Sequence, residues 1–208
     1  IRSGPFFAAS DFIEATISGK GGHAAKPQET IDPTVIASQI VVALQTIASR
    51  RADPVKQVVV SVTSFETSSN AFNVIPQEVK IKGTVRTLDP EVRDLAEKEF
   101  LRITKLTAEA LGGSADAKYT RGYPVMSNSD QQTEFAAKVA RDVSGKCDEA
   151  PLVMGGEDFA YMLEERPGAY ILIGNGDSAP VHHPEYNFND DAIPVSYTHL
   201  RAHETSFH

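Results

Sequence analysis

Apolar and polar residues alternate or recur with periods that predict four strands and two helices in the first part of the chain. Residues 11–18 alternate apolar and polar side chains, the period of a strand with one buried face. Asp32-Pro33 is typical of a helix start, and apolar residues follow it three and four positions apart. In chain order, the expected elements are a strand at 11–18, a helix after Asp32-Pro33, strands at 56–65 and 74–88, a helix after Asp89-Pro90, and a strand at 115–121.

This order of elements predicts a ferredoxin-like βαββαβ fold for residues 11–122. One antiparallel sheet covered by two helices would bury a core of its own. A domain boundary is expected at residues 122–124, Gly-Tyr-Pro. The fold class of the chain as a whole is α/β (α+β), with a second part after this boundary.

Residues 123–195 show a mixed helix and strand pattern. Helices are expected at 131–144 and 159–165, with a Gly-Gly-Glu-Asp turn before the second and a strand at 169–174. A segment of about 70 residues is small for an independent core. We therefore interpret it as the C-terminal part of a larger α/β domain.

Composition and charge narrow the class of protein. The 208 residues carry 20 Lys and Arg against 28 Asp and Glu, a net charge of −8, which disfavours nucleic acid as a partner. No apolar run reaches the ~20 residues of a membrane span. A single cysteine, Cys147, fits a reducing compartment, so we expect a cytoplasmic protein. The start lacks Met and a signal peptide, and we read the chain as an internal piece of a longer one.

A glycine-rich loop with a histidine follows the first expected strand. His23 stands in the Gly-Gly-His-Ala-Ala motif of residues 21–25. The motif fits a surface turn whose glycines adopt positive φ. It also fits an imidazole presented to a ligand, where it could donate a hydrogen bond to an oxyanion.

Asn73 stands at the entry to the expected strand at 74–88, and Arg86 lies near the far end of that strand. They fit a turn asparagine and a solvated arginine, but the pair could also bind a carboxylate, with Arg86 as a bidentate donor. A strand rises ~3.3 Å per residue, so both cannot reach one small group by the shortest route.

Two further motifs contain possible ligands. Glu157 lies in the Gly-Gly-Glu-Asp-Phe motif of residues 155–159, where acids would also suit a helix start. His182 and His183 follow the expected strand at 169–174; either a surface position or a metal-ligand role fits them. No HxH, HExxH or CxxC cluster accompanies them.

The order of these motifs is more specific than any one of them. The series resembles the aminoacylase/hippurate-hydrolase branch of the metal-dependent amidohydrolases and carboxypeptidases, which includes N-acyl-amino-acid and auxin-conjugate hydrolases. The motifs are GGHAA at 21–25, NVIP at 73–76, GTVRT at 83–87, GGEDF at 155–159, HHP at 182–184 and FND at 188–190.

The resemblance implies an enzyme that cleaves the amide of an N-acyl or N-aroyl amino acid with two divalent metal ions, zinc or manganese. Residues 11–122 would be a lid through which the protein forms a homodimer. His23 would stabilise the tetrahedral intermediate in the partner's active site, and Asn73 with Arg86 would bind the substrate carboxylate. His182 would be a metal ligand, and Glu157 an acid lining the site. Asn73 and Arg86 could bind one carboxylate despite their separation along the strand if strand twist brings them together, or if they contribute to sites in different subunits.

Two departures from the family pattern shape the interpretation. The other metal ligands and the general-base glutamate of the family precede the lid, and residues 1–10 do not supply them, so we expect this chain alone to have little activity. Residues 196–208 resemble translated sequencing-adapter read-through and are read as a non-native tail. The alternative function is a non-catalytic dimerisation or ligand-binding module that retains the lid fold.

Overall fold

The computed structural model describes residues 1–193, so the expected non-native tail at 196–208 lies outside the described residues. The chain divides into two compact units. We call residues 7–126 and 153–158 the sandwich unit, and residues 1–6, 127–152 and 159–193 the flanking unit. None of the helices within residues 1–193 combines the length and hydropathy of a membrane span.

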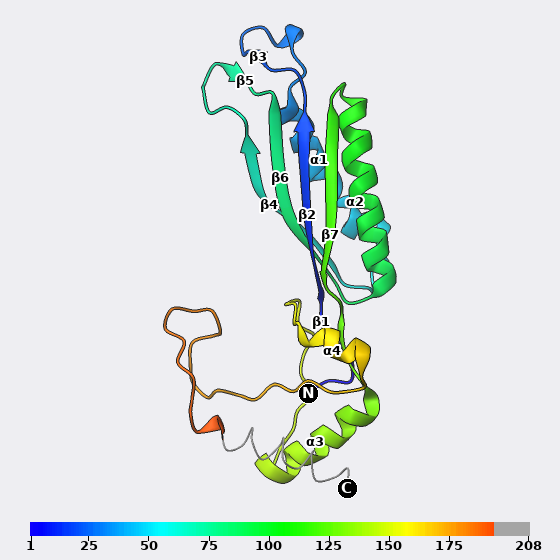
Figure 1. Ribbon diagram of the computed structural model, residues 1–208, viewed down its shortest axis with the longest axis vertical. Coiled ribbons are helices and arrows are strands. Elements are labelled where there is room, and N and C mark those ends of the chain that lie inside the picture. Colours follow the sequence, from blue (N-terminus) through cyan, green and yellow to red (C-terminus); the bar gives the residue numbers. More distant parts are fainter. Residues whose placement is uncertain (194–208) are drawn as a thin grey trace. The chain divides into compact units, whose positions relative to one another are not determined.

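The sandwich unit has the predicted βαββαβ order (Figure 1). Its four-stranded sheet runs β4-β6-β2-β7, and every neighbouring pair is antiparallel. This order confirms the ferredoxin-like sandwich. The elements are β2 (Ala9–Ser18), β3 (Gly22–His23), the 3₁₀ turn η1 (Pro27–Glu29), α1 (Pro33–Leu44), the π-helical turn η2 (Ile47–Arg51), β4 (Val58–Thr67), β5 (Val74–Ile75), β6 (Glu78–Thr87), α2 (Pro90–Ala110) and β7 (Ser114–Tyr123).

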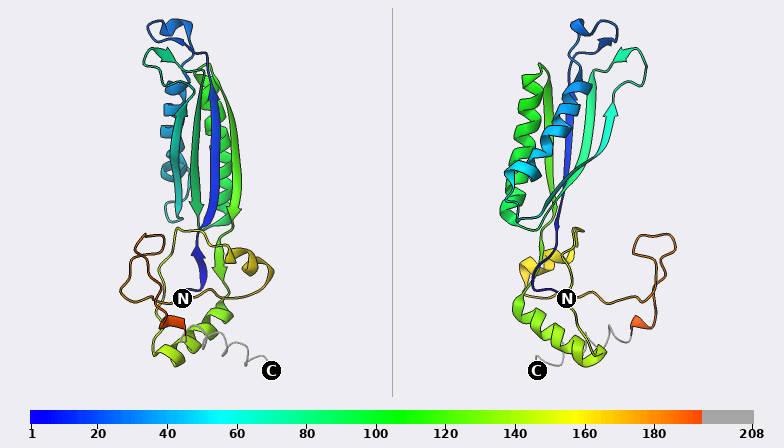
Figure 2. Two further views of the ribbon diagram at one scale, coloured as in Figure 1. Left: turned by 60° about the vertical axis from the view of Figure 1, so that its left-hand side comes forward. Right: turned by 180° about the vertical axis from the view of Figure 1, so that it is seen from behind.

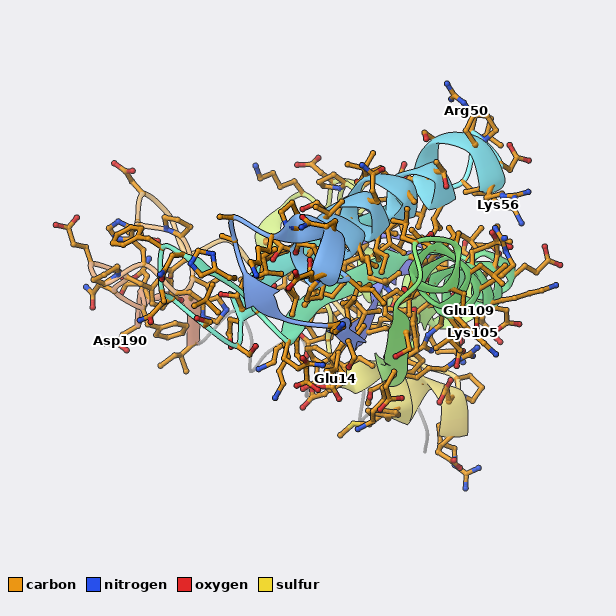
Figure 3. The ribbon with its side chains drawn as sticks, turned by 90° about the horizontal axis from the view of Figure 1, so that it is seen from above. Glu14, Arg50, Lys56, Lys105, Glu109 and Asp190 are labelled. Atoms are coloured by element: carbon orange, nitrogen blue, oxygen red, sulfur yellow. The ribbon has the colours of Figure 1, made fainter. Side chains whose placement is uncertain are left out.

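Both helices cover the same face of this sheet (Figure 2). On β2, Ile13 and Ile17 point to the helices and are buried, whereas Phe12 and Glu14 on the opposite face are exposed. Viewed along the strands, Glu14 lies on the side away from α1 (Figure 3). The alternation of β2 therefore separates a covered face from a face without helices. Helix residues in the core include Ile36, Ile40, Leu44, Ala96, Phe100 and Ile103.

The two Asp-Pro signals start helices as expected. The Asp32 carboxylate accepts a hydrogen bond from the Thr34 N–H at 2.8 Å. The Asp89 carboxylate accepts from the N–H groups of Glu91 and Val92, at 2.9 and 3.2 Å. In each case the proline occupies the first helical turn, where its missing N–H costs nothing.

The strand expected at 74–88 is interrupted. β5 ends at Ile75, and β6 begins at Glu78. Pro76 stands between them and has no N–H to donate to a ladder. The interruption separates a short strand that pairs with β3 from the long strand in the main sheet.

The flanking unit contains mostly helix and irregular segments. β1 (Gly4–Phe7) and β8 (Met126–Asn128) form a two-stranded sheet, followed by α3 (Asp130–Ser144) and α4 (Phe159–Glu165). Both expected helices are confirmed. The strand expected at 169–174 is wrong, because those residues join no ladder. Instead, the Asn128 side chain bonds the backbone of Tyr170, donating to its C=O at 3.0 Å and accepting from its N–H at 2.7 Å.

Candidate functional site

One end of the sandwich unit carries His23 and Asn73 together. His23 is in β3 and pairs with Val74 in β5, so the residue before Val74 lies beside the histidine loop. The Ala24 N–H donates to the Asn73 carbonyl oxygen at 3.0 Å. Both side chains are exposed. β3 and β5 lie at the end of the sheet that is uppermost in Figure 1. Pairing of two short strands thus brings together two sequence-predicted site residues.

The local fold also orients the His23 ring. Its Nδ1 accepts a hydrogen bond from the Ala25 N–H at 3.1 Å. In the neutral imidazole the proton is then on Nε2, which can donate to a ligand. Gly21 permits this loop geometry, because a Cβ there would lie 2.8 Å from the Ile75 carbonyl oxygen. The arrangement suits a hydrogen-bond donor more than a general base.

Arg86 lies near the opposite end of β6. It pairs with Ser10 of β2 and Val59 of β4, and it is half-buried. Arg86 follows Glu78, the first residue of β6, by eight positions, a separation of roughly 26 Å along the strand. Asn73 precedes Glu78. Strand twist therefore does not bring Asn73 and Arg86 of one chain together, and this alternative is wrong.

The Gly-Gly-Glu-Asp segment lies at the same end as Arg86. Residues 153–158 belong to the sandwich unit, and a Cβ on Gly156 would lie 3.2 Å from Arg86 Nη1. Glu157 follows directly and is half-buried in the loop before α4. Arg86 and the segment that carries Glu157 are therefore neighbours, although they are separated by many residues in the sequence.

The two adjacent histidines belong to the flanking unit and differ in their hydrogen bonding. His183 Nδ1 accepts from the Glu185 N–H at 3.1 Å, which leaves the proton of the neutral ring on Nε2. That hydrogen bond engages the Nδ1 lone pair, one of the two ring positions through which a histidine can bind a metal. His182 is exposed, and its backbone has φ of 70°. The metal-ligand role of His182 stays a prediction.

A buried polar cluster was missed by the sequence analysis. Asp11 is buried on the helix-covered face of β2, where its carboxylate receives hydrogen bonds from Arg93 Nε and Nη2 at 2.9 and 2.6 Å. The Tyr119 hydroxyl donates to it at 2.7 Å. Burial, followed by this hydrogen bond, raises the pKa of Tyr119 well above its ordinary value. The sequence did contain a signal for this cluster, because Asp11 falls on the same alternating positions of β2 as the buried residues Ile13 and Ile17.

The comparisons with known proteins agree with this architecture. Residues 9–202 match the peptidase family M20/M25/M40. The chain belongs to this family. This M20 chain is 36% identical to an N-acetyl-L-cysteine deacetylase of Bacillus subtilis, covering 93% of the chain and 46% of the relative. It is 40% identical to IAA-amino acid hydrolase ILR1-like 2 of Arabidopsis thaliana, with the same two coverages.

A solved relative supplies the structural comparison. The YxeP protein of Bacillus subtilis, described as a dinuclear metal binding peptidase from the M20 family, superposes with a TM-score of 0.80 at 28% identity. The match covers 96% of this chain and 50% of that one. The chain spans about half the length of the curated relatives it matches. These comparisons confirm the family resemblance and the fold class, whereas the roles of the site residues stay predictions.

The residues of this chain fit a dinuclear centre only in part. His182 offers an exposed imidazole, the donor type that zinc and manganese accept. Among residues 1–193, however, no three His, Cys, Asp or Glu side chains lie close enough together to hold a metal ion. The described residues therefore do not by themselves form a metal centre.

Proposed function

We propose that this chain is part of an enzyme that hydrolyses the amide bond of N-acyl or N-aroyl amino acids. Its family membership supports an amide hydrolase, and the names of the deacetylase and the IAA-amino acid hydrolase support the substrate class. In this proposal residues 11–122 are the lid, and residues 123–195 belong to the catalytic domain.

One observation carries the proposal to the level of residues. His23 and Asn73 lie at one end of the sandwich unit, whereas Arg86 and the Glu157 segment lie at the other. Each end has part of the chemistry that an acyl-amino-acid hydrolase needs. A complete site then takes the first pair from one subunit and Arg86 from another.

The edge of the sheet supports a second copy as the partner. Among the described residues, β4 pairs only with β6. The backbone groups on its outer edge are therefore available to a strand of another subunit. On α1, Val35 and Val42 are exposed on a helix that is otherwise packed against the sheet. A two-fold homodimer that joins β4 edges would bury such a surface on both subunits.

In this proposal, the residues of this chain stabilise the negative charge that develops during amide hydrolysis and orient the substrate through its carboxylate. Attack of water on the amide carbon converts the carbonyl oxygen into an oxyanion. The Nε2–H of His23 from one subunit donates to that oxygen, where the negative charge develops. Arg86 of the other subunit binds the substrate carboxylate through two parallel hydrogen bonds, and the Asn73 amide adds a third donor.

Glu157 and His182 complete the proposal. Glu157 lines the site beside Arg86, and His182 is one ligand of the two divalent ions, zinc or manganese, that the resemblance implies. Such ions polarise the amide carbonyl and activate water. Because residues 1–193 lack a full ligand set, we expect the 208-residue chain by itself to show little turnover of acyl amino acids with added zinc or manganese. Measurable metal-dependent turnover would contradict this expectation.

A subunit-mixing experiment tests the shared site. In the full-length enzyme, His23→Ala removes the oxyanion donor and should lower kcat by about 10²–10³-fold. Arg86→Met should weaken carboxylate binding. When the two variants are mixed and allowed to exchange subunits, each heterodimer has one site with both native residues. Activity should therefore rise on mixing well above that of either variant alone.

The control mixes His23→Ala with Asn73→Ala, which alter the same end of the lid. In that heterodimer every site lacks one native residue, and activity should not return. If the first mixture also stays inactive while subunit exchange is verified, His23 and Arg86 do not act in the shared site.

A cytoplasmic location and the absence of nucleic-acid and membrane partners stay predictions.

A further inference from the structure

A β-bulge lies where β7 runs beside the start of β2. Phe12 pairs with Thr120, but Ser10 pairs with Tyr123, so Arg121 and Gly122 together face Asp11. Successive side chains of a strand point to opposite faces, and one extra residue therefore reverses the faces of everything beyond it. The bulge places Tyr123 on the face without helices, in line with Ser10.

Asp11 and Arg93 hold the bulge from the helix-covered face. Asp11 Oδ1 accepts a hydrogen bond from the Gly122 N–H at 3.0 Å, within the bulge. Arg93 Nη2 donates to the carbonyl oxygens of Gly122 and Tyr123 at 3.1 and 3.3 Å. Asp11 and Arg93 are themselves buried and bidentately paired, and together they fix the backbone of residues 122–123 from the helix-covered face.

On the opposite face, Gly156 packs where Ser10, Arg86 and Tyr123 meet. A Cβ at Gly156 would lie 2.7 Å from Ser10 Cβ, 3.1 Å from Tyr123 Cδ2 and 3.2 Å from Arg86 Nη1. Ser10 is only 4% exposed. The backbone of Gly156 therefore lies against the Arg86 guanidinium with no room for a side chain.

We propose that Asp11, Arg93 and Gly156 are positioning residues for Arg86. The Asp11–Arg93 pair holds the bulge in place, and the bulge positions Tyr123 beside Ser10. Gly156 packs against Tyr123 and Ser10 and thereby fixes the direction of the Arg86 guanidinium. This inference rests on the proposed function, in which Arg86 binds the substrate carboxylate. A bidentate contact tolerates little displacement, so the support beneath the arginine contributes directly to recognition of the carboxylate.

Two neighbouring glycines provide a matched test. In Gly156→Ala the new methyl group meets Ser10, Tyr123 and Arg86. In Gly155→Ala it has only ordinary contacts, 3.5 Å from Val153 Cγ1 and 3.9 Å from Phe7 Cδ1. The full-length enzyme is assayed with an N-acyl amino acid and with the corresponding carboxamide. The kcat/KM for the carboxylate substrate is divided by that for the carboxamide, and this ratio isolates recognition of the carboxylate from the chemical step.

We expect Arg86→Met to lower this ratio by roughly 10- to 100-fold, as for a lost charge-assisted contact. Gly156→Ala should lower it in the same direction, mainly through KM for the carboxylate substrate, whereas Gly155→Ala should leave it near the native value. A native ratio in Gly156→Ala, alongside a lowered ratio in Arg86→Met, would overturn the positioning role and leave the proposed function standing.

The buried pair is tested from the other side of the sheet. Arg93→Lys keeps the charge but cannot reproduce the bidentate fork, and it should lower the ratio. Arg121→Lys is the control, because Arg121 pairs with Asp94 and Glu97 on the exposed surface. Thermal unfolding is recorded for each variant. If Arg93→Lys fails to fold, the glycine pair still decides the proposal.

A readout without catalysis separates the two hypotheses. In an NMR spectrum of the 208-residue chain, the Arg86 Nε–Hε signal should shift in Gly156→Ala and in Arg93→Lys, but not in the two controls. If this signal shifts while Arg86→Met leaves the ratio unchanged, the positioning holds and the carboxylate role of Arg86 fails. If the signal does not shift, the positioning inference is wrong whatever the kinetics show.

Discussion

The sandwich unit and the flanking unit bury their apolar residues to very different extents. The core cluster, from Ile13 to Ala108, lies entirely in the sandwich unit. In the flanking unit, Leu172 and Phe188 are 51% and 50% exposed. A sheet with two helices closes a core from one continuous segment, whereas the extended residues at 169–174 have no strand beside them in residues 1–193. Local helix signals suffice for α3 and α4, but a buried strand needs non-local partners.

The largest expected difference between the two units is in the free energy of unfolding that is lost when a large apolar residue is truncated. Phe100 is fully buried beneath the sheet, so Phe100→Ala should lower the free energy of unfolding by about 3–5 kcal/mol. Leu172→Ala, at a half-exposed position, should change it by less than about 0.5 kcal/mol. Urea unfolding followed by circular dichroism measures both. A large cost at Leu172 would show that the flanking unit has a core that its exposure does not reveal.

The next largest effect concerns ion pairs inside the sandwich unit. Arg93→Met leaves the Asp11 carboxylate buried without its partner and should cost about 3 kcal/mol. Arg121→Met removes two ion pairs at the surface, with Asp94 and Glu97, and the expected cost is below about 1 kcal/mol. Equal unfolding midpoints in urea would contradict the role of the buried cluster.

Helix caps offer a smaller contrast between the units. Asp89 accepts two backbone N–H groups at the start of α2, and Asp89→Ala should cost about 1 kcal/mol. Ser129 precedes α3 but makes no side-chain cap hydrogen bond. Its hydroxyl accepts one hydrogen bond from the Gly168 N–H, at 3.3 Å, so Ser129→Ala should cost less than Asp89→Ala. Amide hydrogen exchange in the first turn of each helix distinguishes the two. A larger increase in exchange rate in α3 on Ser129→Ala than in α2 on Asp89→Ala would contradict the expected order.

The smallest effect appears at alkaline pH. The pKa of Tyr119 is raised in the folded state, mainly by burial and then by its hydrogen bond to Asp11. Above pH 10.0, its ordinary pKa, the unfolded chain releases the proton while the folded chain keeps it. Stability should therefore fall as pH rises beyond 10.0, and Tyr119→Phe should fall less steeply. Parallel curves of unfolding midpoint against pH would contradict this linkage.

Several features of the fold follow from short stretches of sequence. Asp32-Pro33 and Asp89-Pro90 start α1 and α2 because cap and proline act within one helical turn. The apolar spacing of Ile36, Ile40 and Leu44 identifies the buried face of α1. The motif order also predicted the M20 family. These signals are local, so the chain carries them whatever its distant parts do.

The sequence by itself determined the element order, the helix starts and the types of residue available for chemistry. Only the tertiary structure decided that Asn73 lies beyond the start of β6 while Arg86 lies near its far end, and that Asp11 is buried against Arg93. The same holds for the face that Tyr123 occupies, which one extra residue in β7 reverses. Strand register is set by hydrogen bonds between distant segments, and a shift of one residue leaves local patterns unchanged while it moves a side chain to the other face of the sheet.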